Sequence, residues 1–116
     1  MRSNKSLFPN LPSTPAYKWV RKTDKLPAIG ATEHDADPLY RVKLFSPDGG
    51  WYWFISECGT DEDPDLCFGL VKGFETELGY FSLAELREVR GALGLPIERD
   101  IHFKPTRRSE LGPRFS

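Results

Sequence analysis

The chain has 116 residues, of which 39% are hydrophobic and 28% are charged, and its net charge is -1. A chain of this length is expected to form one domain around one hydrophobic core, and its ordinary globular composition excludes an intrinsically disordered protein. No apolar run approaches the roughly 20 residues that cross a bilayer, and residues 1–15 lack the hydrophobic region of a signal peptide, so we expect a cytoplasmic protein.

Charge is unevenly distributed along the chain. Residues 1–26 carry six basic groups against Asp24 alone, whereas residues 57–77 carry seven carboxylates against Lys72 alone. The first segment therefore has a charge of +5 and the second a charge of -6. An acidic centre and a basic start could attract each other, or each could face a partner of its own.

The first 37 residues are predicted to form an arm with little regular structure. Prolines at positions 9, 12, 15 and 27 stand among Ser, Asn, Thr and charged residues, which favours turns over helices and strands. Tyr17, Trp19 and Val20 are the candidates for anchoring this arm. The predicted organisation is a basic, Pro-rich arm (1–37), an α+β core domain (38–105) and a basic C-terminal tail (106–116).

A tryptophan-rich β-hairpin is predicted after the arm. Tyr40, Val42 and Leu44 recur at every second position, which is the period of a strand with one buried face. The Pro-Asp-Gly-Gly run at residues 47–50 is typical of a turn, because glycine adopts positive φ at little cost. Residues 51–57 then form the return strand, which carries aromatic side chains on both faces, so we expect both faces to be covered in part.

Two further strands are predicted. A short acidic loop at residues 58–65 leads into a strand over residues 66–71, which extends the hairpin into an antiparallel meander. A final strand is expected over residues 97–103, where apolar residues share one face and polar residues share the other.

The strongest local signal is the start of a helix at Leu83. Four residues form this signal: Ser82 as N-cap, Glu85 as its capping-box partner, and Phe81 and Leu86 as a hydrophobic staple. Leu83, Leu86 and Val89 form an apolar stripe, and Gly91 supplies the end of the helix. The predicted fold class is therefore α+β, in which a small antiparallel sheet packs against one main, well-capped helix.

Residues 42–105 contain three characteristic runs, KLFSPDGGWYWFISE, FGLVKGFETELGYFSLAEL and RGALGLPIERDIHFKP. In these runs the chain closely resembles a bacterial family of small proteins classed as a domain of unknown function. Members of that family occur in plasmids, conjugative elements, phages and cyanobacterial and proteobacterial genomes. The resemblance implies a context in mobile genetic elements and no particular activity. The loop at residues 58–65 looks longer and more acidic than the family pattern, so a role for this loop would be particular to this chain.

Glu98, Asp100 and His102 share one face of the predicted final strand and are candidate metal ligands. Alternate strand residues can ligate one divalent ion through carboxylate and imidazole groups. A metal-dependent enzyme would need a further carboxylate, such as Glu57 or Glu77, which only the fold can bring close. A solvated face with salt bridges to nearby arginines is the favoured alternative.

The carboxylates of the acidic centre are the candidates for partner binding. They are Glu57, Asp61, Glu62, Asp63, Asp65, Glu75 and Glu77. An EF-hand loop starting at Asp61 is excluded, because its sixth position is Leu66 in place of Gly and its twelfth is Lys72 in place of Glu. The run is therefore a polar loop, whose carboxylates are available to a basic partner.

Direct nucleic-acid binding has less support. Trp51, Tyr52 and Trp53 could serve as stacking platforms for bases. Phosphate binding needs a basic surface, however, and only the arm and the tail supply one. Core packing is the better explanation for the tryptophans.

Nucleophilic catalysis lacks a motif in this sequence, which contains no GxSxG, P-loop or GxGxxG. Cys58 and Cys67 lack CxxC spacing and are expected to be free thiols, with Cys67 as a small core residue. We expect no cofactor.

Three functions remain open. The favoured one is a non-enzymatic binding protein of a bacterial mobile element or phage that engages a host or phage protein through its acidic surface. In its sharpest form it is an anti-defence inhibitor that occupies the basic groove of a nucleic-acid-processing complex. The alternatives are a metal-dependent enzyme with a carboxylate and histidine site, and a nucleic-acid-binding accessory protein that acts through its basic ends. No membrane partner is expected.

Overall fold

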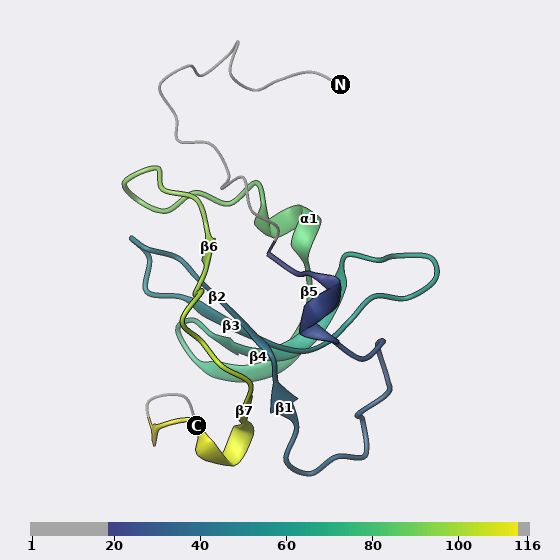
Figure 1. Cartoon of the computed structure of the whole chain (residues 1–116). Coiled ribbons are helices and arrows are strands. Elements are labelled where there is room, and N and C mark those ends of the chain that lie inside the picture. The colour runs from purple at the N-terminus through teal and green to yellow at the C-terminus, as the bar shows by residue number, and fades with distance from the viewer. Residues whose placement is uncertain (1–18, 114–116) are drawn as a thin grey trace.

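The computed structural model describes residues 19–113, which form seven strands, one α-helix and two 3-10 helices. In chain order the elements are η2 Lys22–Asp24, β1 Leu39–Tyr40, β2 Val42–Phe45, β3 Tyr52–Cys58, β4 Leu66–Lys72, β5 Thr76–Ser82, α1 Leu83–Leu86, β6 Glu98–Arg99, β7 Thr106–Arg107 and η3 Arg108–Glu110. A five-stranded antiparallel sheet in the order β5-β4-β3-β2-β6 forms the centre, and β1 pairs with β7 beside it (Figure 1). Among the described residues, no helix has the length and apolar character that a membrane span requires.

The fold is mainly β, so the predicted α+β class with one main helix is wrong. The predicted start of the helix is confirmed, because the hydroxyl of Ser82 accepts a hydrogen bond from the backbone N–H of Glu85 over 3.4 Å. α1 nevertheless ends at Leu86, and Val89, the third residue of the predicted stripe, is exposed.

The helix is short because the residues that follow it are bound elsewhere. Arg90 forms an isolated antiparallel bridge with Pro96, and the backbone N–H of Gly91 donates to the carbonyl of Leu95. The carboxylate of Asp48, in the turn between β2 and β3, accepts a hydrogen bond of 2.7 Å from the N–H of Leu93. The bridge of Arg90 requires an extended conformation at the end of the predicted helix, and the contacts from Gly91 onward hold the following residues in turns.

The predicted tryptophan-rich hairpin is confirmed by the pairing of β2 with β3, in which Leu44 lies opposite Trp53. β4 confirms the strand predicted over residues 66–71. The final predicted strand is reduced to β6, because the chain turns after it and the N–H of His102 donates to the side chain of Asp100. β5 was not predicted and forms the border of the sheet.

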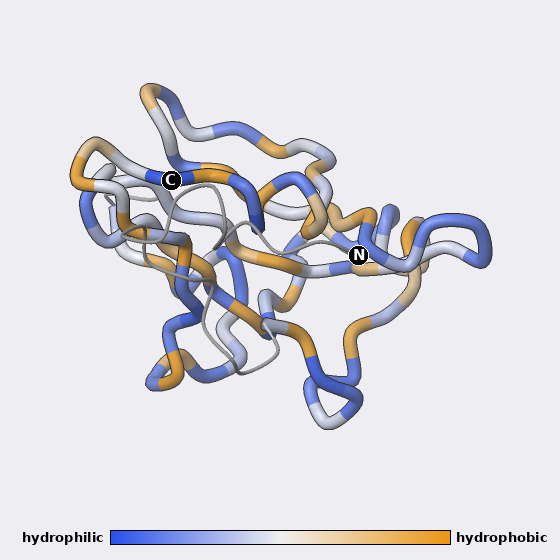
Figure 2. Tube along the Cα trace, turned by 90° about the horizontal axis from the view of Figure 1, so that it is seen from above, coloured by the Kyte–Doolittle hydropathy of each residue, from blue (hydrophilic) through white to orange (hydrophobic). Residues whose placement is uncertain are grey.

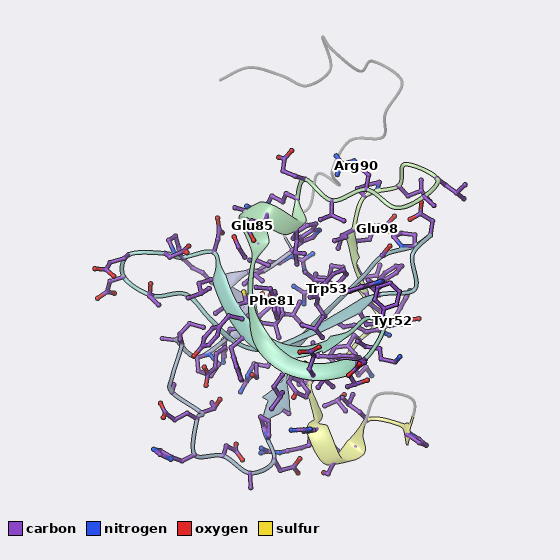
Figure 3. All side chains as sticks on the ribbon, turned by 180° about the vertical axis from the view of Figure 1, so that it is seen from behind. Tyr52, Trp53, Phe81, Glu85, Arg90 and Glu98 are labelled. Carbon is purple, nitrogen blue, oxygen red and sulfur yellow. The ribbon has the colours of Figure 1, made fainter. Side chains whose placement is uncertain are left out.

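The sheet buries apolar side chains on both faces. On its concave face Val42, Leu44, Trp53 and Ile55 pack with Trp19 and with Leu83 and Leu86 of α1. Figure 3 shows Trp53 between α1 and the curved sheet. On its convex face Phe54 and Leu70 form a second cluster with Tyr40, Phe103 and Leu111. Trp19 therefore anchors the start of the described chain as predicted, whereas Tyr17 lies outside the described residues.

Candidate functional site

The acidic residues predicted to bind a partner do not form one surface. Residues 19–113 contain all 17 carboxylates but only 12 of the 16 lysines and arginines, so this part of the chain has a net charge of -5. Within it, β4 separates the loop at residues 59–65 from the turn at residues 73–75. At about 3.3 Å per residue, the seven residues of β4 place the two acidic groups roughly 20 Å apart.

Glu57 lies inside the protein and is only 3% exposed. The backbone N–H groups of Gly30 and Thr32 donate to its carboxylate over 2.7 and 2.8 Å, and the hydroxyl of Thr32 donates to the same group. Burial by itself would raise the pKa of Glu57, but these three hydrogen bonds hold the pKa below its ordinary value. Glu57 therefore fixes the segment around residues 30–32 to the sheet and does not face a partner.

The loop after β3 carries the exposed part of the acidic set. Asp61, Glu62 and Asp63 are exposed, and the loop projects from the side of the molecule as a hydrophilic segment (Figure 2). Asp65 forms an ion pair of 3.5 Å with Arg87, just beyond α1. Within residues 19–113 no ion pair engages Asp61 or Glu62, so their charge is available to a partner.

The predicted metal ligands are not brought together. Asp100 pairs with Lys43 over 3.5 Å and accepts a hydrogen bond from the backbone of His102, while Glu98 lies on β6 opposite Phe45. In the described part of the chain, no three His, Cys, Asp or Glu side chains lie close enough to hold a metal ion. A metal-dependent enzyme therefore gains no support from this arrangement.

The two cysteines face each other across the sheet. Cys58 in β3 lies directly opposite Cys67 in β4, and both are free thiols. Cys67 is buried in the concave core, as its sequence context predicts.

The aromatic residues of the hairpin have structural roles. Trp53 is buried, and the ring of Trp51 stacks on it with centroids 6.0 Å apart. Tyr52 lies on the opposite face, where the Nζ atom of Lys43 is 4.8 Å from the ring centroid. This arrangement supports core packing as the main role of the tryptophans.

β5 presents an open backbone edge. It pairs with β4 over seven consecutive residues without a bulge, and within residues 19–113 no strand pairs with its other side. In Figure 3, β5 runs down from α1 as the border of the sheet. Long edge strands of this kind are templates for pairing with another chain, and natural proteins usually blunt them with proline, bulges or lysine. β5 contains none of these three features, and its one charged side chain is Glu77.

The hydrogen-bond pattern identifies the residues that face outward. At the two ends of the β4–β5 ladder, the N–H of Gly73 donates to the carbonyl of Glu75, and the N–H of Leu83 donates to the carbonyl of Asp65. Because bonded and non-bonded positions alternate in an antiparallel ladder, the odd-numbered residues of β5 direct their N–H and C=O groups to β4. The even-numbered residues Thr76, Leu78 and Tyr80 direct theirs to the open side.

A groove lies along β5 on the concave face. It encloses about 420 Å³, and its lining includes Trp51, Phe74, Glu75, Glu77 and Gly79. The Phe74 side chain is 93% exposed, and its ring meets Trp51 edge-on at a centroid distance of 5.6 Å. No ion pair within residues 19–113 engages Glu75 or Glu77. Aromatic rings beside carboxylates suit a cationic ligand, through cation–π attraction and ion pairing.

Comparison with protein families assigns the chain to one of them. The model of a family of proteins of unknown function, DUF2958, matches residues 20–110. The chain belongs to this family. The DUF2958 match covers every strand of the fold, α1 and the groove along β5. Comparisons with curated proteins and with solved structures give no match.

The sequence of this DUF2958 member carries a signal for β5 that pattern reasoning missed. Gly73, Phe74 and Glu75 form a three-residue connection that contains glycine, which is typical of a hairpin between two strands. The strand itself lacks a clear period of two, because Glu77 and Gly79 occupy one face while Leu78 and Tyr80 are exposed on the other. The turn, and not the strand, is therefore the usable signal.

Proposed function

We propose that this chain is a non-enzymatic binding protein that captures an extended, basic segment of a host or phage protein along β5. The observation that carries this proposal is the open edge of β5 beside a groove with two carboxylates and three aromatic side chains. An added strand gains affinity from main-chain hydrogen bonds and specificity from the pockets that its side chains enter.

Charge supports a basic partner. The described residues have a net charge of -5, and Glu75 and Glu77 stand next to the outward-facing groups of β5. Opposite charges raise the association rate and align the partner, and this effect weakens with salt. Binding is therefore expected to be salt-sensitive.

We infer that this role belongs to a mobile genetic element, as the family resemblance implies, and an anti-defence inhibitor is its narrower form. Nucleic-acid-binding proteins often carry basic terminal segments, and capture of such a segment would withdraw it from DNA or RNA. The exposed carboxylates of Asp61, Glu62 and Asp63 would add a second acidic contact for a large partner.

The test is affinity capture of a host protein with wild type and a Leu78→Pro variant. Proline at position 78 removes an outward N–H group without removing a hydrogen bond to β4, so the fold is retained and strand addition is blocked. Leu78→Ala is the matched control, because it shortens the same side chain and keeps the N–H group. Equal melting temperatures show that the variants fold.

The expected result is a captured protein with a basic segment that binds wild type and Leu78→Ala and is lost with Leu78→Pro. Hydrogen exchange provides the second measurement. The amides of Thr76, Leu78 and Tyr80 should exchange faster than those of Glu77 and Gly79 in the free protein, and should become protected in the complex. A partner that binds Leu78→Pro as tightly as wild type contradicts the proposal.

A further inference from the structure

A second cavity lies along β5 on the convex face of the sheet. It encloses about 250 Å³ and is lined by Phe68, Leu78 and Tyr80 together with Ser56, Glu57, Arg108 and residues of the segment 30–38. The rings of Phe68 and Tyr80 contact each other with centroids 4.9 Å apart. Leu78 and Tyr80 line both this cavity and the concave groove, so β5 itself separates the two.

We propose that the partner segment alternates basic and apolar residues, with basic side chains in the concave groove and apolar side chains in the convex cavity. This inference rests on the proposed function and adds the sequence pattern of the partner. Successive side chains of a strand point to opposite faces, and directly opposed residues of neighbouring strands point to the same face. A strand added to β5 must therefore supply its side chains to the two spaces in turn.

The concave groove has the chemistry of a basic side-chain site. Residues of the added strand opposite Glu77 and Gly79 point into it. Gly79 leaves room there, because a Cβ atom at this position would meet no atom within 4 Å. The position of Trp51 is fixed, because its ring lies so close to Gly73 that a Cβ atom on Gly73 would be 2.4 Å from Cη2. A lysine or arginine would reach the ring of Trp51 and the carboxylate of Glu77.

The part of the convex cavity that β4 and β5 contribute has the chemistry of an apolar site, because Phe68, Leu78 and Tyr80 line it there, whereas the other lining residues include the charged Glu33, Asp35 and Arg108. Residues of the added strand opposite Leu78 and Tyr80 point toward it. Its buried polar groups are already satisfied, because Glu57 accepts three hydrogen bonds and the hydroxyl of Ser56 donates to the carbonyl of Phe68 over 3.2 Å. A charged side chain would find no unpaired buried group here, whereas an isoleucine or valine would cover the ring of Phe68.

The experiment compares two synthetic heptapeptides of the same composition with the full chain. One alternates lysine and isoleucine, and the other groups four lysines before three isoleucines, so charge and hydrophobicity are equal. Binding is measured by NMR titration of backbone amides at low salt. The alternating peptide is expected to bind about tenfold more tightly than the grouped peptide, with the largest shifts at Leu78 and Tyr80.

One variant and one further peptide test which space binds the basic side chains and which binds the apolar ones. Glu77→Gln should weaken the alternating peptide several-fold, whereas Glu88→Gln, which removes an exposed carboxylate outside both spaces, should leave it unchanged. A third peptide with serine in place of isoleucine should also bind several-fold more weakly to wild type. Loss of both effects would overturn the assignment of the two spaces.

The outcomes separate this inference from the proposed function. Equal binding of the two heptapeptides, abolished for both by Leu78→Pro, overturns the alternating pattern and supports edge binding. Binding of the alternating peptide to Leu78→Pro as tightly as to wild type overturns both. If the protein forms a concentration-dependent dimer that Leu78→Pro abolishes, a second copy of the chain occupies the edge of β5. If peptide binding appears only after the basic residues of the arm are changed, the arm occupies this edge. Either result overturns the inference.

Discussion

A buried carboxylate is stable only where donors replace the water that it loses, and Glu57 has three such donors. Replacement by glutamine keeps the shape of the side chain but directs an NH₂ group toward a donor of Gly30 or Thr32. We expect Glu57→Gln to lower the free energy of unfolding by about 1–3 kcal/mol, measured by urea denaturation. Glu62→Gln removes an exposed carboxylate of the loop after β3. This variant should change the free energy of unfolding by less than about 0.5 kcal/mol. Equal stability of the two variants would show that Glu57 is not the anchor of residues 30–32.

Two carboxylates give stability a defined dependence on pH. Burial by itself would raise the pKa of Asp24, but hydrogen bonds from Arg99, at 2.7 Å, and from the backbone of Arg21 lower it, and the pKa of Glu57 is lowered as well. A carboxyl whose pKa is lower in the folded state stabilises the protein above its unfolded pKa of about 4, and this contribution is lost as the pH falls through the folded pKa. The urea midpoint should therefore fall below about pH 4. In an Asp24→Asn, Glu57→Gln double variant this fall should be smaller, and an unchanged fall would assign it to other groups.

At the level of elements, two glycines that face each other across β4 and β5 have different roles. A Cβ atom on Gly69 would lie 1.7 Å from the backbone carbonyl oxygen of Phe54 in β3, whereas Gly79 has open space. Backbone in the middle of a sheet cannot move aside cheaply, so Gly69→Ala should destabilise the protein by about 1–3 kcal/mol or more. Gly79→Ala should stay within about 0.5 kcal/mol of wild type. Thermal denaturation of this pair is the measurement, and a tolerated Gly69→Ala would mean that β3 and β4 are further apart than described.

Elements differ in how much of them local sequence determines. The β2–β3 hairpin and the N-cap at Ser82 were predictable, because alternation with a Gly-rich turn and a capping side chain act over a few residues. The length of α1 was not, because Arg90, which the pattern places within the helix, forms a bridge with Pro96. The candidate site was predictable only in part. Glu75 and Glu77 were identified from charge, but Trp51 and the open edge of β5 join them only through the pairing of β3, β4 and β5.

At the level of the whole molecule, the start of the described chain closes over the concave face of the sheet. Trp19 is 3% exposed and belongs to the same core as Trp53 and Leu83. The guanidinium of Arg99 donates to the carbonyl of Trp19 and forms a two-point ion pair with Asp24. Residues from 19 onward therefore belong to the folded unit, although their composition resembles that of a flexible arm.

This closure predicts unequal effects for two aromatic residues. Trp19→Ala should lower the free energy of unfolding by about 3–5 kcal/mol, because it leaves a large cavity between α1 and the sheet. Phe74→Ala removes an aromatic ring that is 93% exposed, so stability should change by less than about 0.5 kcal/mol. Phe74→Ala should weaken binding of the alternating lysine-isoleucine peptide more than Trp19→Ala does, since Phe74 lines the groove and Trp19 does not. Urea denaturation and NMR titration of both variants measure the two quantities, and a stable Trp19→Ala protein would place the boundary of the folded unit after Trp19.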